Sequence, residues 1–363
     1  MAKKIVVIAA GGTGGHLFPA AAFAEEMFRR GWRVFLMTDA RGRRYAEGFP
    51  AERIEDVSSA SLSPNPVTLV PSLIKIWRGI NVAKRRFAES PPSLVAGFGG
   101  YPSFPALMAA RAKKAPILIH EQNSVLGRVN RAMAISAKIV ACGFERLDRL
   151  PERAASHKRV VGNPVRLPIL AVRERPYPEA PAGGELNLLI IGGSQGARLF
   201  GDVIPEAIAM LGDKLRARLK VVHQVREEQI GEARKVYERA GVNAEVAAFF
   251  TDMGQRLGAA HLVIARAGAS TVTELQVAGR PAILVPFAAA ADDHQTANAE
   301  GLTGVGAADL FTEAEFEPAA LASLLERRLG DPHGLAVRAA AARAAAKPEA
   351  AKTLADLAES ISA

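Results

Sequence analysis

The chain has 363 residues, of which 49% are hydrophobic and 23% charged. This composition is typical of a globular protein large enough for two cores, and it excludes a disordered chain. The net charge of +9 indicates an anionic partner, and nucleic acid is disfavoured among such partners because aromatic residues make up only 6% of the chain and no nucleic-acid motif occurs.

The single cysteine, Cys142, excludes an intramolecular disulfide and indicates a buried thiol in a reducing compartment. No run of about eighteen apolar residues occurs, so the sequence predicts no membrane-spanning helix. The N-terminus lacks the pattern of a secretory signal, and we expect a cytoplasmic chain.

Strands and helices alternate along the first part of the sequence, which predicts a parallel α/β sheet. We expect strands over residues 4–10, 33–38, 93–98, 116–120 and 138–142. The first of them ends in the glycine-rich turn GGTGGH, from Gly11 to His16. Such a turn is typical of a phosphate-binding loop, where backbone amides and the positive end of a helix point toward an anion. The pattern also occurs in ordinary tight turns, and it lacks the G-x-G-x-x-G spacing of dinucleotide-binding folds.

Residues 70–89 have the pattern of an amphipathic helix with a basic border. The predicted apolar face consists of Leu73, Ile76, Trp77 and Ile80, and the basic residues beside it are Lys75, Arg78, Lys84, Arg85 and Arg86. One interpretation is a helix that packs on its own sheet and turns its charges to solvent. The other is a surface helix that inserts Trp77 and its neighbours among lipid headgroups while the cations contact anionic lipid.

A new series of strands follows the proline-rich segment 165–185, which lacks helical periodicity and indicates a crossing between domains. We expect strands over residues 186–191, 219–224, 244–249, 261–265 and 282–286, and a helical tail over residues 335–361 that could pack back on the first domain. The first of these strands also ends in a glycine-rich turn, GGSQGAR, from Gly192 to Arg198. Two such turns predict two doubly wound domains that face a central cleft, where a substrate with a diphosphate would bind.

The segment RAGASTVTE, from Arg266 to Glu274, indicates a further anion-binding turn with an acid beside it. A carboxylate at Glu274 suits the two hydroxyls of a ribose, whereas it would repel a phosphate. Glu274 is also typical of a capping box at a helix start. Downstream, Gln295 and Asn298 stand three residues apart on one face of a predicted helix, with amides suited to sugar hydroxyls.

The chain resembles the MurG family of glycosyltransferases in seven segments that follow in the family's order: GGTGGH, GGYPS, HEQN, GNPVR, GGSQGAR, RAGASTVTE and DDHQTANA. The resemblance covers almost the whole chain. It implies an α/β fold of GT-B architecture with two doubly wound Rossmann-like domains. Residues 1–164, rejoined by a C-terminal helix over residues 343–363, would bind the acceptor and the membrane, and residues 165–342 would bind the donor.

The resemblance implies the inverting transfer of N-acetylglucosamine from UDP-N-acetylglucosamine to the C4 hydroxyl of the muramoyl sugar in lipid I, an undecaprenyl-diphosphate-linked N-acetylmuramoyl pentapeptide. The product, lipid II, serves peptidoglycan synthesis. The resemblance also implies peripheral attachment to the anionic cytoplasmic face of the inner membrane, no cofactor and no nucleic-acid partner.

Residue roles follow from the resemblance by motif. Donor contacts would come from Thr13, Gly14, Gly15, Asn123, Arg166, Ser194, Phe250, Ala269, Ser270, Thr271, Val272, Thr273, Glu274, Gln295 and Asn298. Glu274 would hold the ribose, and Phe250, where family members tend to carry an aliphatic residue, would offer its backbone to the uracil. Positions near the reacting sugars would be His16, Tyr101, His120, Glu121 and Asn298. The chain departs from the pattern at His294, where some members carry glutamine.

The reaction requires a base to take the proton of the acceptor hydroxyl, and His16 and Glu121 remain the alternatives. We prefer His16 for its place after the first glycine-rich turn, although contact with the donor phosphate would also suit it. The sequence has no Asp-x-Asp metal motif, since Asp292 and Asp293 are adjacent. The helix ends at Gly14 and Ser194, together with Arg166, would therefore stabilise the leaving UDP without a metal.

Two other classes of function stay open. A nicotinamide-dependent oxidoreductase would use Asp39 for the cofactor ribose, but it would leave the second glycine-rich turn without a role. A non-catalytic subunit that binds sugar nucleotides at a membrane would fit the basic helix equally well.

Overall fold

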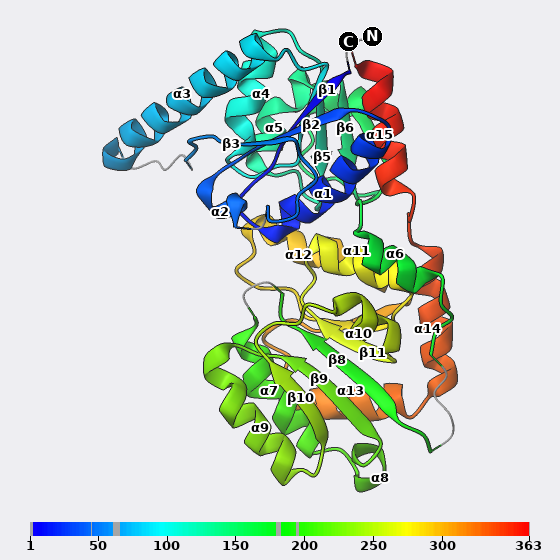
Figure 1. The fold of residues 1–363 in the computed structure, drawn as a ribbon. Coiled ribbons are helices and arrows are strands. Elements are labelled where there is room, and N and C mark those ends of the chain that lie inside the picture. The colour runs from blue at the N-terminus through cyan, green and yellow to red at the C-terminus, as the bar shows by residue number, and fades with distance from the viewer. Residues whose placement is uncertain (1–2, 45, 61–65, 179–182, 194–195, 363) are drawn as a thin grey trace. The chain divides into compact units, whose positions relative to one another are not determined.

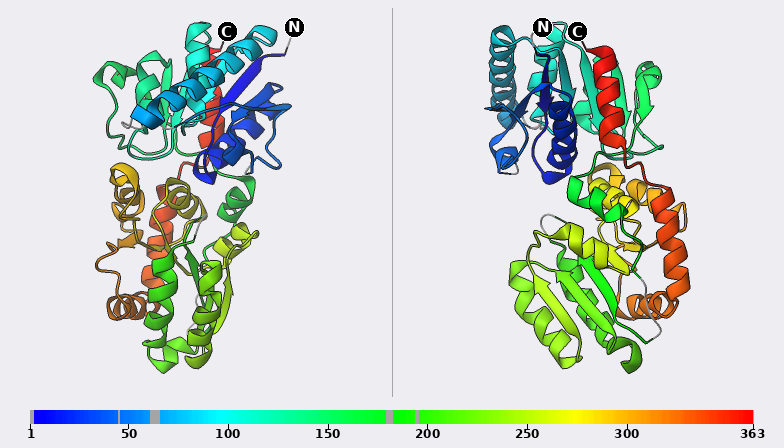
Figure 2. Two further views of the ribbon diagram at one scale, coloured as in Figure 1. Left: turned by 90° about the vertical axis from the view of Figure 1, so that its left-hand side faces the viewer. Right: turned by 45° about the vertical axis from the view of Figure 1, so that its right-hand side comes forward.

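The computed structural model describes residues 3–44, 46–60, 66–178, 183–193 and 196–362. The chain divides into two compact units, Met1–Arg166 together with Lys347–Ala363, and Leu167–Ala346. We call them the N-terminal domain and the C-terminal domain. Each contains a parallel β-sheet covered by helices, which is the α/β architecture that the sequence predicts (Figure 1 and Figure 2).

The described part of the N-terminal domain forms a seven-stranded sheet in the order β3-β2-β1-β4-β5-β6-β7. Its strands are β1 (Ile5–Ala9), β2 (Arg33–Thr38), β3 (Arg53–Asp56), β4 (Leu94–Gly97), β5 (Ile117–Glu121), β6 (Ile139–Cys142) and β7 (Lys158–Val160). Its α-helices are α1 (Gly14–Arg29), α2 (Ala40–Arg43), α3 (Pro66–Glu89), α4 (Ser103–Ala112), α5 (Arg128–Met133) and α15 (Ala350–Ile361).

Strand β1 is buried on both sides, because its successive residues point to opposite faces of the sheet and helices cover both faces. Val6 and Ile8 pack with α1 and α15, whereas Ile5, Val7 and Ala9 pack with α3, α4 and α5. Burying an aliphatic side chain of this size contributes about 1.5–3 kcal/mol. The glycine-rich turn after β1 therefore starts from a strand that is held in place on both faces.

The described part of the C-terminal domain forms a six-stranded sheet in the order β10-β9-β8-β11-β12-β13. Its strands are β8 (Leu186–Ile191), β9 (Leu219–Gln224), β10 (Asn243–Ala247), β11 (Leu262–Ala265), β12 (Ala282–Leu284) and β13 (Ala308–Leu310). Its α-helices are α6 (Leu167–Arg173), α7 (Arg198–Ala209), α8 (Asp213–Arg216), α9 (Ile230–Arg239), α10 (Met253–Ala259), α11 (Ala269–Ala278), α12 (His294–Thr303), α13 (Pro318–Leu329) and α14 (Pro332–Ala344).

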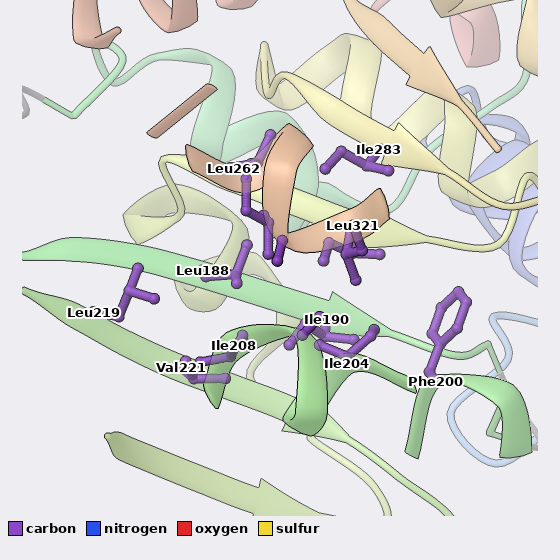
Figure 3. Close-up of a cluster of buried hydrophobic side chains, with 14 of the residues drawn as sticks. Leu188, Ile190, Phe200, Ile204, Ile208, Leu219, Val221, Leu262, Ile283 and Leu321 are labelled. Atoms are coloured by element: carbon purple, nitrogen blue, oxygen red, sulfur yellow. The ribbon is translucent and has the colours of Figure 1, made fainter. Parts of the chain in front are cut away.

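The central strand β8 carries one face of the C-terminal core. Leu188 and Ile190 point into a cluster with Phe200 and Ile204 of α7 and with Leu321 of α13 (Figure 3). All five side chains are at most 1% exposed. The second glycine-rich turn thus also follows a strand fixed by its own core.

The predicted strands are confirmed in type and order, with ends that shift by a few residues. Strands β3, β7 and β13 are not predicted from the sequence, and each of these lies at an edge of its sheet. Their residues alternate poorly between buried and exposed positions. An edge strand has one neighbour and half-exposed faces, so the apolar pattern that reveals a central strand is absent.

Two expectations about the connecting segments are wrong. Residues 165–185 are not free of helix, because α6 forms with Ile169 and Val172 buried and with Pro168 in its first turn, where a missing amide costs nothing. The C-terminal helix expected over residues 343–363 begins later, because α14 ends at Ala344 and α15 begins at Ala350. Pro348 lies between them and disfavours helix at the residue before it.

Helix α3 packs through one side and exposes apolar side chains on the other. Its packed side carries Ile76, Ala83 and Phe87 at 8% exposure or less, and Ile80 is half-buried. The predicted apolar face is therefore wrong for Ile76 and Ile80, which belong to the side that covers the domain. In Figure 1 the first turns of α3 extend beyond the rest of the N-terminal domain.

The exposed apolar side of α3 lies along those first turns. It consists of residues spaced at i, i+3, i+4 and i+7: Val70 at 59% exposure, Leu73 at 49%, Ile74 at 46% and Trp77 at 65%. This spacing places all four on one helical face. We call this set the α3 apolar stripe.

Candidate active site

The candidate residues of the N-terminal domain gather at the carboxyl ends of its strands, the edge at which open α/β sheets bind ligands. His16 follows β1, Tyr101 follows β4, His120 and Glu121 end β5, and Arg166 comes after β7. Because β1 pairs with β4 and β4 pairs with β5, the ends of these three strands are neighbours.

The first glycine-rich turn leaves the amino end of α1 without a capping side chain. Thr13 is the N-cap residue, and its exposed side chain makes no capping hydrogen bond. Gly12 has φ of +88°, a conformation that favours glycine. The described first turn holds no acidic residue that would offset the helix dipole. Gly14 and Gly15 therefore begin a helix whose positive end suits a phosphate.

His16 is half-buried in the first turn of α1, and its ring is fixed on one side. Nδ1 lies 3.1 Å from Oε1 of Gln122. A Cβ added to Gly99 or Gly100 would lie 3.3 or 3.4 Å from the ring, so the backbone of the β4–α4 turn lies close beside it. Among the described residues, Nε2 of His16 has no hydrogen-bond partner.

The carboxylate of Glu121 is 2% exposed and accepts hydrogen bonds from four donors of its own chain. Oε1 accepts from the backbone and side-chain amides of Asn123, at 3.1 Å each. Oε2 accepts from the backbone of Gly127 and from the side chain of Asn130, at 2.9 Å each. The loop between β5 and α5 is folded around this carboxylate, which also holds the half-buried Asn123 in place.

His120 is completely buried and is held from both of its ring nitrogens. Nε2 lies 3.0 Å from the carbonyl oxygen of Gly162, and Nδ1 lies 3.2 Å from Nε2 of Gln122. Burial lowers the pKa of His120 to about 4, so this imidazole is neutral at physiological pH. Its ring lies behind Gln122 and is not exposed to a ligand.

Two further residues complete this edge of the N-terminal sheet. The guanidinium of Arg166 lies 4.4 Å from the centre of the Phe18 ring, near the start of α1. Tyr101 is half-buried, next to the turn of Gly99 and Gly100 that passes His16. A cation, a phenol and an imidazole are thus placed around the amino end of α1.

In the C-terminal domain the second glycine-rich turn follows β8, as predicted. Gly193 and Gly196 have φ of +85° and +67°, whereas Ser194 lies outside the described residues. Gln224, at the end of β9 and 4% exposed, donates its side-chain amide to the carbonyl oxygens of Gly193 at 3.1 Å and Ala248 at 3.2 Å. This amide joins the turn to the segment that leads to Phe250.

The ring of Phe250 is buried at 7% exposure, with the guanidinium of Arg256 4.0 Å from its centre. The preceding Phe249 is 68% exposed. The buried ring of Phe250 is therefore not available to a ligand, and the expected contact of its backbone with the uracil stays a prediction.

Helix α11 begins with Gly268 as N-cap and without a capping side chain. Ala269, Val272 and Thr273 are buried, whereas Ser270, Thr271 and Glu274 are partly exposed. A capping box requires its acid three residues after the N-cap, and Glu274 stands six residues after Gly268. The capping-box interpretation of Glu274 is therefore wrong, and its carboxylate lies on the partly exposed side of the helix.

The two amides of α12 have different surroundings. Asn298 is completely buried and donates to the carbonyl oxygen of Ala267 at 3.2 Å, just before α11. Gln295 is half-buried, and its Oε1 accepts from the backbone amide of Phe287 at 3.0 Å. Asn298 thus holds the turn before α11. The spacing of three residues predicts that Asn298 and Gln295 share one face suited to sugar hydroxyls, and this is wrong because Asn298 is buried.

Asp39, Asp292 and Asp293 have local structural roles. Asp39 caps α2 by accepting a hydrogen bond from the amide of Gly42 at 2.8 Å, so its carboxylate has a structural partner in place of a cofactor ribose. Asp292 and Asp293 take left-handed backbone conformations, with φ of +58° and +51°, before α12. Within the described residues, no three histidine, cysteine, aspartate or glutamate side chains gather as metal ligands would.

Three further polar residues, Gln122, Gln224 and Arg266, are not predicted from the sequence to belong to the site. Arg266 is 11% exposed at the end of β11, where it donates to the carbonyl oxygens of Val285 and Pro286 and pairs with Glu313 at 2.5 Å. Gln122 lies inside the motif HEQN and Arg266 inside RAGASTVTE. These positions within the motifs are the feature of the sequence that could have indicated a role at the site. The partners of these two residues include backbone carbonyls of Phe98, Val285 and Pro286, which sequence spacing does not reveal.

The α3 apolar stripe is accompanied by cations. Lys75, Arg78 and Arg85 are exposed and Lys84 is half-buried, and none of them forms an ion pair with a described residue. Arg86 differs, because it pairs with Glu55 and Glu89. Over the described ranges, no helix has the length and hydropathy needed to cross a bilayer.

Comparison with known proteins gives similarity over both domains. Residues 6–142 match the N-terminal domain of glycosyltransferase family 28, and residues 187–354 match its C-terminal domain. The UDP-N-acetylglucosamine–N-acetylmuramyl-(pentapeptide) pyrophosphoryl-undecaprenol N-acetylglucosamine transferase of Maricaulis maris is 50% identical over 98% of this chain and 97% of its own length. The protein of the same name from Rhizobium johnstonii is 47% identical over 100% of this chain and 97% of its own length.

Solved structures agree with this similarity. The crystal structure of Acinetobacter baumannii MurG matches with a TM-score of 0.80 and 33% identity, covering 98% of this chain and 99% of that one. The glycosyltransferase of kitacinnamycin matches with a TM-score of 0.71 at 17% identity over 100% of both chains, which supports the fold alone.

Proposed function

The chain belongs to the MurG family of glycosyltransferases, with the two Rossmann-like domains of the GT-B fold, and from this premise we propose how its residues divide the reaction. It transfers N-acetylglucosamine from UDP-N-acetylglucosamine to the N-acetylmuramoyl sugar of lipid I and forms lipid II. The observation that carries the conclusion is the similarity to transferases of this one specificity over nearly the full length of both chains. The oxidoreductase and the non-catalytic subunit are not supported, and Asp39 is committed to a helix cap.

The donor is bound by turns and helix starts of both domains. In the C-terminal domain Glu274 holds the ribose hydroxyls, the backbone of Phe250 meets the uracil, and Gln295 reaches the sugar. The partly exposed side of α11 and the half-buried side chain of Gln295 support these assignments. The remaining donor contacts are those of the shared motifs: Thr13, Gly14, Gly15, Asn123, Arg166, Ser194, Ala269, Ser270, Thr271, Val272 and Thr273.

His16 is the general base of the transfer. The C4 hydroxyl oxygen of the acceptor attacks the anomeric carbon of the donor, its proton passes to Nε2 of His16, and the bond from that carbon to the diphosphate oxygen breaks with its electron pair. Direct displacement of this kind inverts the anomeric centre. His16 is preferred over Glu121 because every oxygen of the Glu121 carboxylate already accepts two hydrogen bonds from the chain.

The departing UDP carries the negative charge that develops in the transition state. The amino end of α1 at Gly14 and Gly15, the turn that contains Ser194, and the guanidinium of Arg166 offset this charge. On the acceptor side, Tyr101 contacts the muramoyl sugar. His120 and Asn298 do not contact the substrates, because both side chains are completely buried. They hold neighbouring groups in place: His120 contacts Gln122, and Asn298 donates to the carbonyl oxygen of Ala267.

Helix α3 holds the protein to the anionic cytoplasmic face of the inner membrane as a peripheral protein. The α3 apolar stripe enters the headgroup region, and Lys75, Arg78, Lys84 and Arg85 contact anionic lipid. This places the active site at the surface where an acceptor with an undecaprenyl chain is embedded. The exposure of Leu73 and Trp77 supports the assignment.

The transfer is tested by following UDP release from UDP-N-acetylglucosamine. We expect release only when lipid I is present, and little release from the galactosamine epimer. Release that needs no acceptor, or equal use of the epimer, would contradict the proposed specificity.

The base is tested with His16→Ala. Loss of a positioned base lowers kcat by about 10²-fold to 10⁴-fold. Calorimetry with UDP separates this loss from a loss of donor binding, because a variant that lacks only the base keeps its affinity for UDP. Turnover at the wild-type rate would remove His16 from the mechanism.

A further inference from the structure

We propose that Gln122 is a positioning residue that holds neutral His16 in the Nδ1–H tautomer, so that the lone pair of the imidazole is on Nε2. Gln122 is 2% exposed and lies between the rings of His16 and His120. The assignment of the His16 tautomer rests only on hydrogen bonds inside the N-terminal domain. The catalytic consequence of this tautomer rests on the proposed role of His16 as base.

The carbonyl oxygen of Phe98 fixes the orientation of the Gln122 amide. Nε2 of Gln122 lies 3.0 Å from this oxygen, which can only accept a hydrogen bond. If the amide were turned over, two oxygens would face each other at that distance without a proton between them. Nε2 therefore faces Phe98, and Oε1 faces Nδ1 of His16 at 3.1 Å.

His120 uses the second proton of the same amide. Nε2 of His120 lies 3.0 Å from the carbonyl oxygen of Gly162 and must donate to it, so Nε2 carries the proton of this neutral imidazole. Nδ1 of His120 is then an acceptor, and it lies 3.2 Å from Nε2 of Gln122. Both amide protons of Gln122 are thus directed away from His16.

The atom of Gln122 that faces His16 is therefore the acceptor Oε1. Oε1 of Gln122 carries no proton, so Nδ1 of His16 must donate one to it. In the neutral imidazole the other nitrogen, Nε2, then has the lone pair, and Nε2 has no partner among the described residues. The chain of donors runs from His16 through Gln122 to His120 and ends at the backbone of Gly162.

This arrangement gives Nε2 of His16 the lone pair that a base requires. During the transfer Nε2 takes the acceptor proton, the imidazole becomes a cation with both nitrogens protonated, and Nδ1 keeps its hydrogen bond to Oε1. The amide oxygen stabilises that cation without adding a buried charge. Gln122 itself touches neither substrate.

The tautomer of His16 can be measured by ¹⁵N NMR on histidine-labelled protein, with His16→Ala to identify the signal. At about pH 8.5 we expect the neutral ring of wild-type His16 to be protonated on Nδ1 and bare on Nε2. A proton on Nε2 of wild-type His16 would overturn the proposal by itself.

Gln122→Met removes the acceptor while keeping a similar volume. We expect both tautomers of His16 to become populated and kcat to fall about 10-fold to 10²-fold, within the range that a positioned base contributes, while the KM for UDP-N-acetylglucosamine stays within about twofold. An unchanged tautomer or an unchanged kcat would overturn the proposal. Gln276→Met is the matched control, because Gln276 is also buried and also donates to a backbone carbonyl, that of Gly301 at 2.8 Å. It should keep the His16 spectrum and the wild-type kcat.

If His16→Ala turns over at the wild-type rate, the base assignment fails, whereas the tautomer experiment judges Gln122 independently of that result.

Discussion

Buried amide side chains hold the candidate active site at the scale of single residues. Gln122 in the N-terminal domain and Gln224 in the C-terminal domain each end or follow a strand, and each donates to carbonyl oxygens of neighbouring turns. A neutral amide satisfies several backbone groups without the cost of burying a charge. The candidate ligand-binding turns are therefore supported by buried polar residues beneath them.

The assignment of Glu274 to the ribose can be tested with Glu274→Gln. A hydrogen bond to a charged group contributes about 1.5–3 kcal/mol, so we expect UDP to bind about 10-fold to 100-fold more weakly in calorimetry. Glu238→Ala, at an exposed glutamate of α9, is the control and should keep the affinity.

The ligand can be varied as well as the protein. For wild type, 2′-deoxy-UDP should bind more weakly than UDP, whereas Glu274→Gln should bind the two nucleotides with similar affinity, because the contact is already lost. Unchanged UDP affinity in Glu274→Gln would remove this residue from the ribose site.

At the scale of elements, the two sides of α3 have different partners. Its packed side covers the N-terminal domain, and the α3 apolar stripe on the other side is left to solvent in the isolated chain. A helix that exposes Leu73 and Trp77 beside unpaired cations is stabilised when a membrane surface covers it. The element thus has a folding role on its packed side, and the proposed membrane contact concerns the other side.

Leu73→Ser with Trp77→Ser should weaken binding to vesicles that contain anionic lipid. Full burial of one such side chain is worth about 1.5–3 kcal/mol, so a loss of at least about tenfold is expected in a flotation assay. Phe28→Ser with Val337→Ser is the control, since both residues are equally exposed apolar positions on other helices, at 60% and 56%. Equal binding by the two double variants would contradict a membrane role for α3.

The cations of α3 have a separate signature. Arg78→Ser with Arg85→Ser should lower vesicle binding at low salt and flatten its salt dependence, because each cation near an anionic surface contributes about 1 kcal/mol that salt screens. Ile76→Ser should behave differently and lower the free energy of unfolding, since Ile76 packs on the domain.

Helix α15 is a structural element of the N-terminal domain, although it comes from the end of the chain. Leu354 is fully buried against the core that contains α1, and Arg30 of α1 pairs with Asp356 and Glu359. Trp32 donates to Glu359 at 3.1 Å, so its fluorescence reports on this contact.

Leu354→Ala should lower the free energy of unfolding of the N-terminal domain by about 2–5 kcal/mol, because it leaves a cavity between α15 and the sheet. The measurement is urea unfolding followed by Trp32 fluorescence in a Trp77→Phe background. Val337→Ala, at an exposed position of α14, should leave the midpoint unchanged. A wild-type midpoint for Leu354→Ala would show that α15 adds little to the domain.

At the scale of the whole molecule, both cores contain a buried neutral histidine. Burial lowers the pKa of His223 to about 3 and that of His120 to about 4. In the unfolded chain an imidazole titrates near about 6.5. Below that pH the unfolded chain binds protons that the folded chain does not bind, so stability is full above about pH 6.5 and is lost as the pH falls.

For each such histidine, the ratio of unfolded to folded protein should rise about tenfold for every pH unit below about 6.5. We expect His223→Gln to remove part of this slope for the C-terminal domain in urea unfolding at pH 7 and pH 5. His333→Gln, at an exposed histidine, should keep the wild-type slope. A wild-type slope in His223→Gln would assign the acid sensitivity to other groups.

The positions of the central strands along the chain, the two glycine-rich turns and most candidate residues could be predicted from the sequence. These features are local, because a buried strand requires a run of apolar residues and a turn with positive φ favours glycine. The motifs around His16, Glu121 and Glu274 could likewise be read along the chain.

Only the tertiary structure decided the edge strands β3, β7 and β13, the packed side of α3, the N-cap of α11 and the partners of Glu121 and Gln122. Each depends on groups far apart in the sequence: an edge strand is defined by the neighbour it lacks, and a buried amide by the carbonyl it meets. The exposure of Ile76 or Asn298 is likewise set by packing across elements and not by spacing within one. Local pattern therefore reveals the central strands and the glycine-rich turns, whereas long-range contacts decide the edge strands and which polar atoms remain for chemistry.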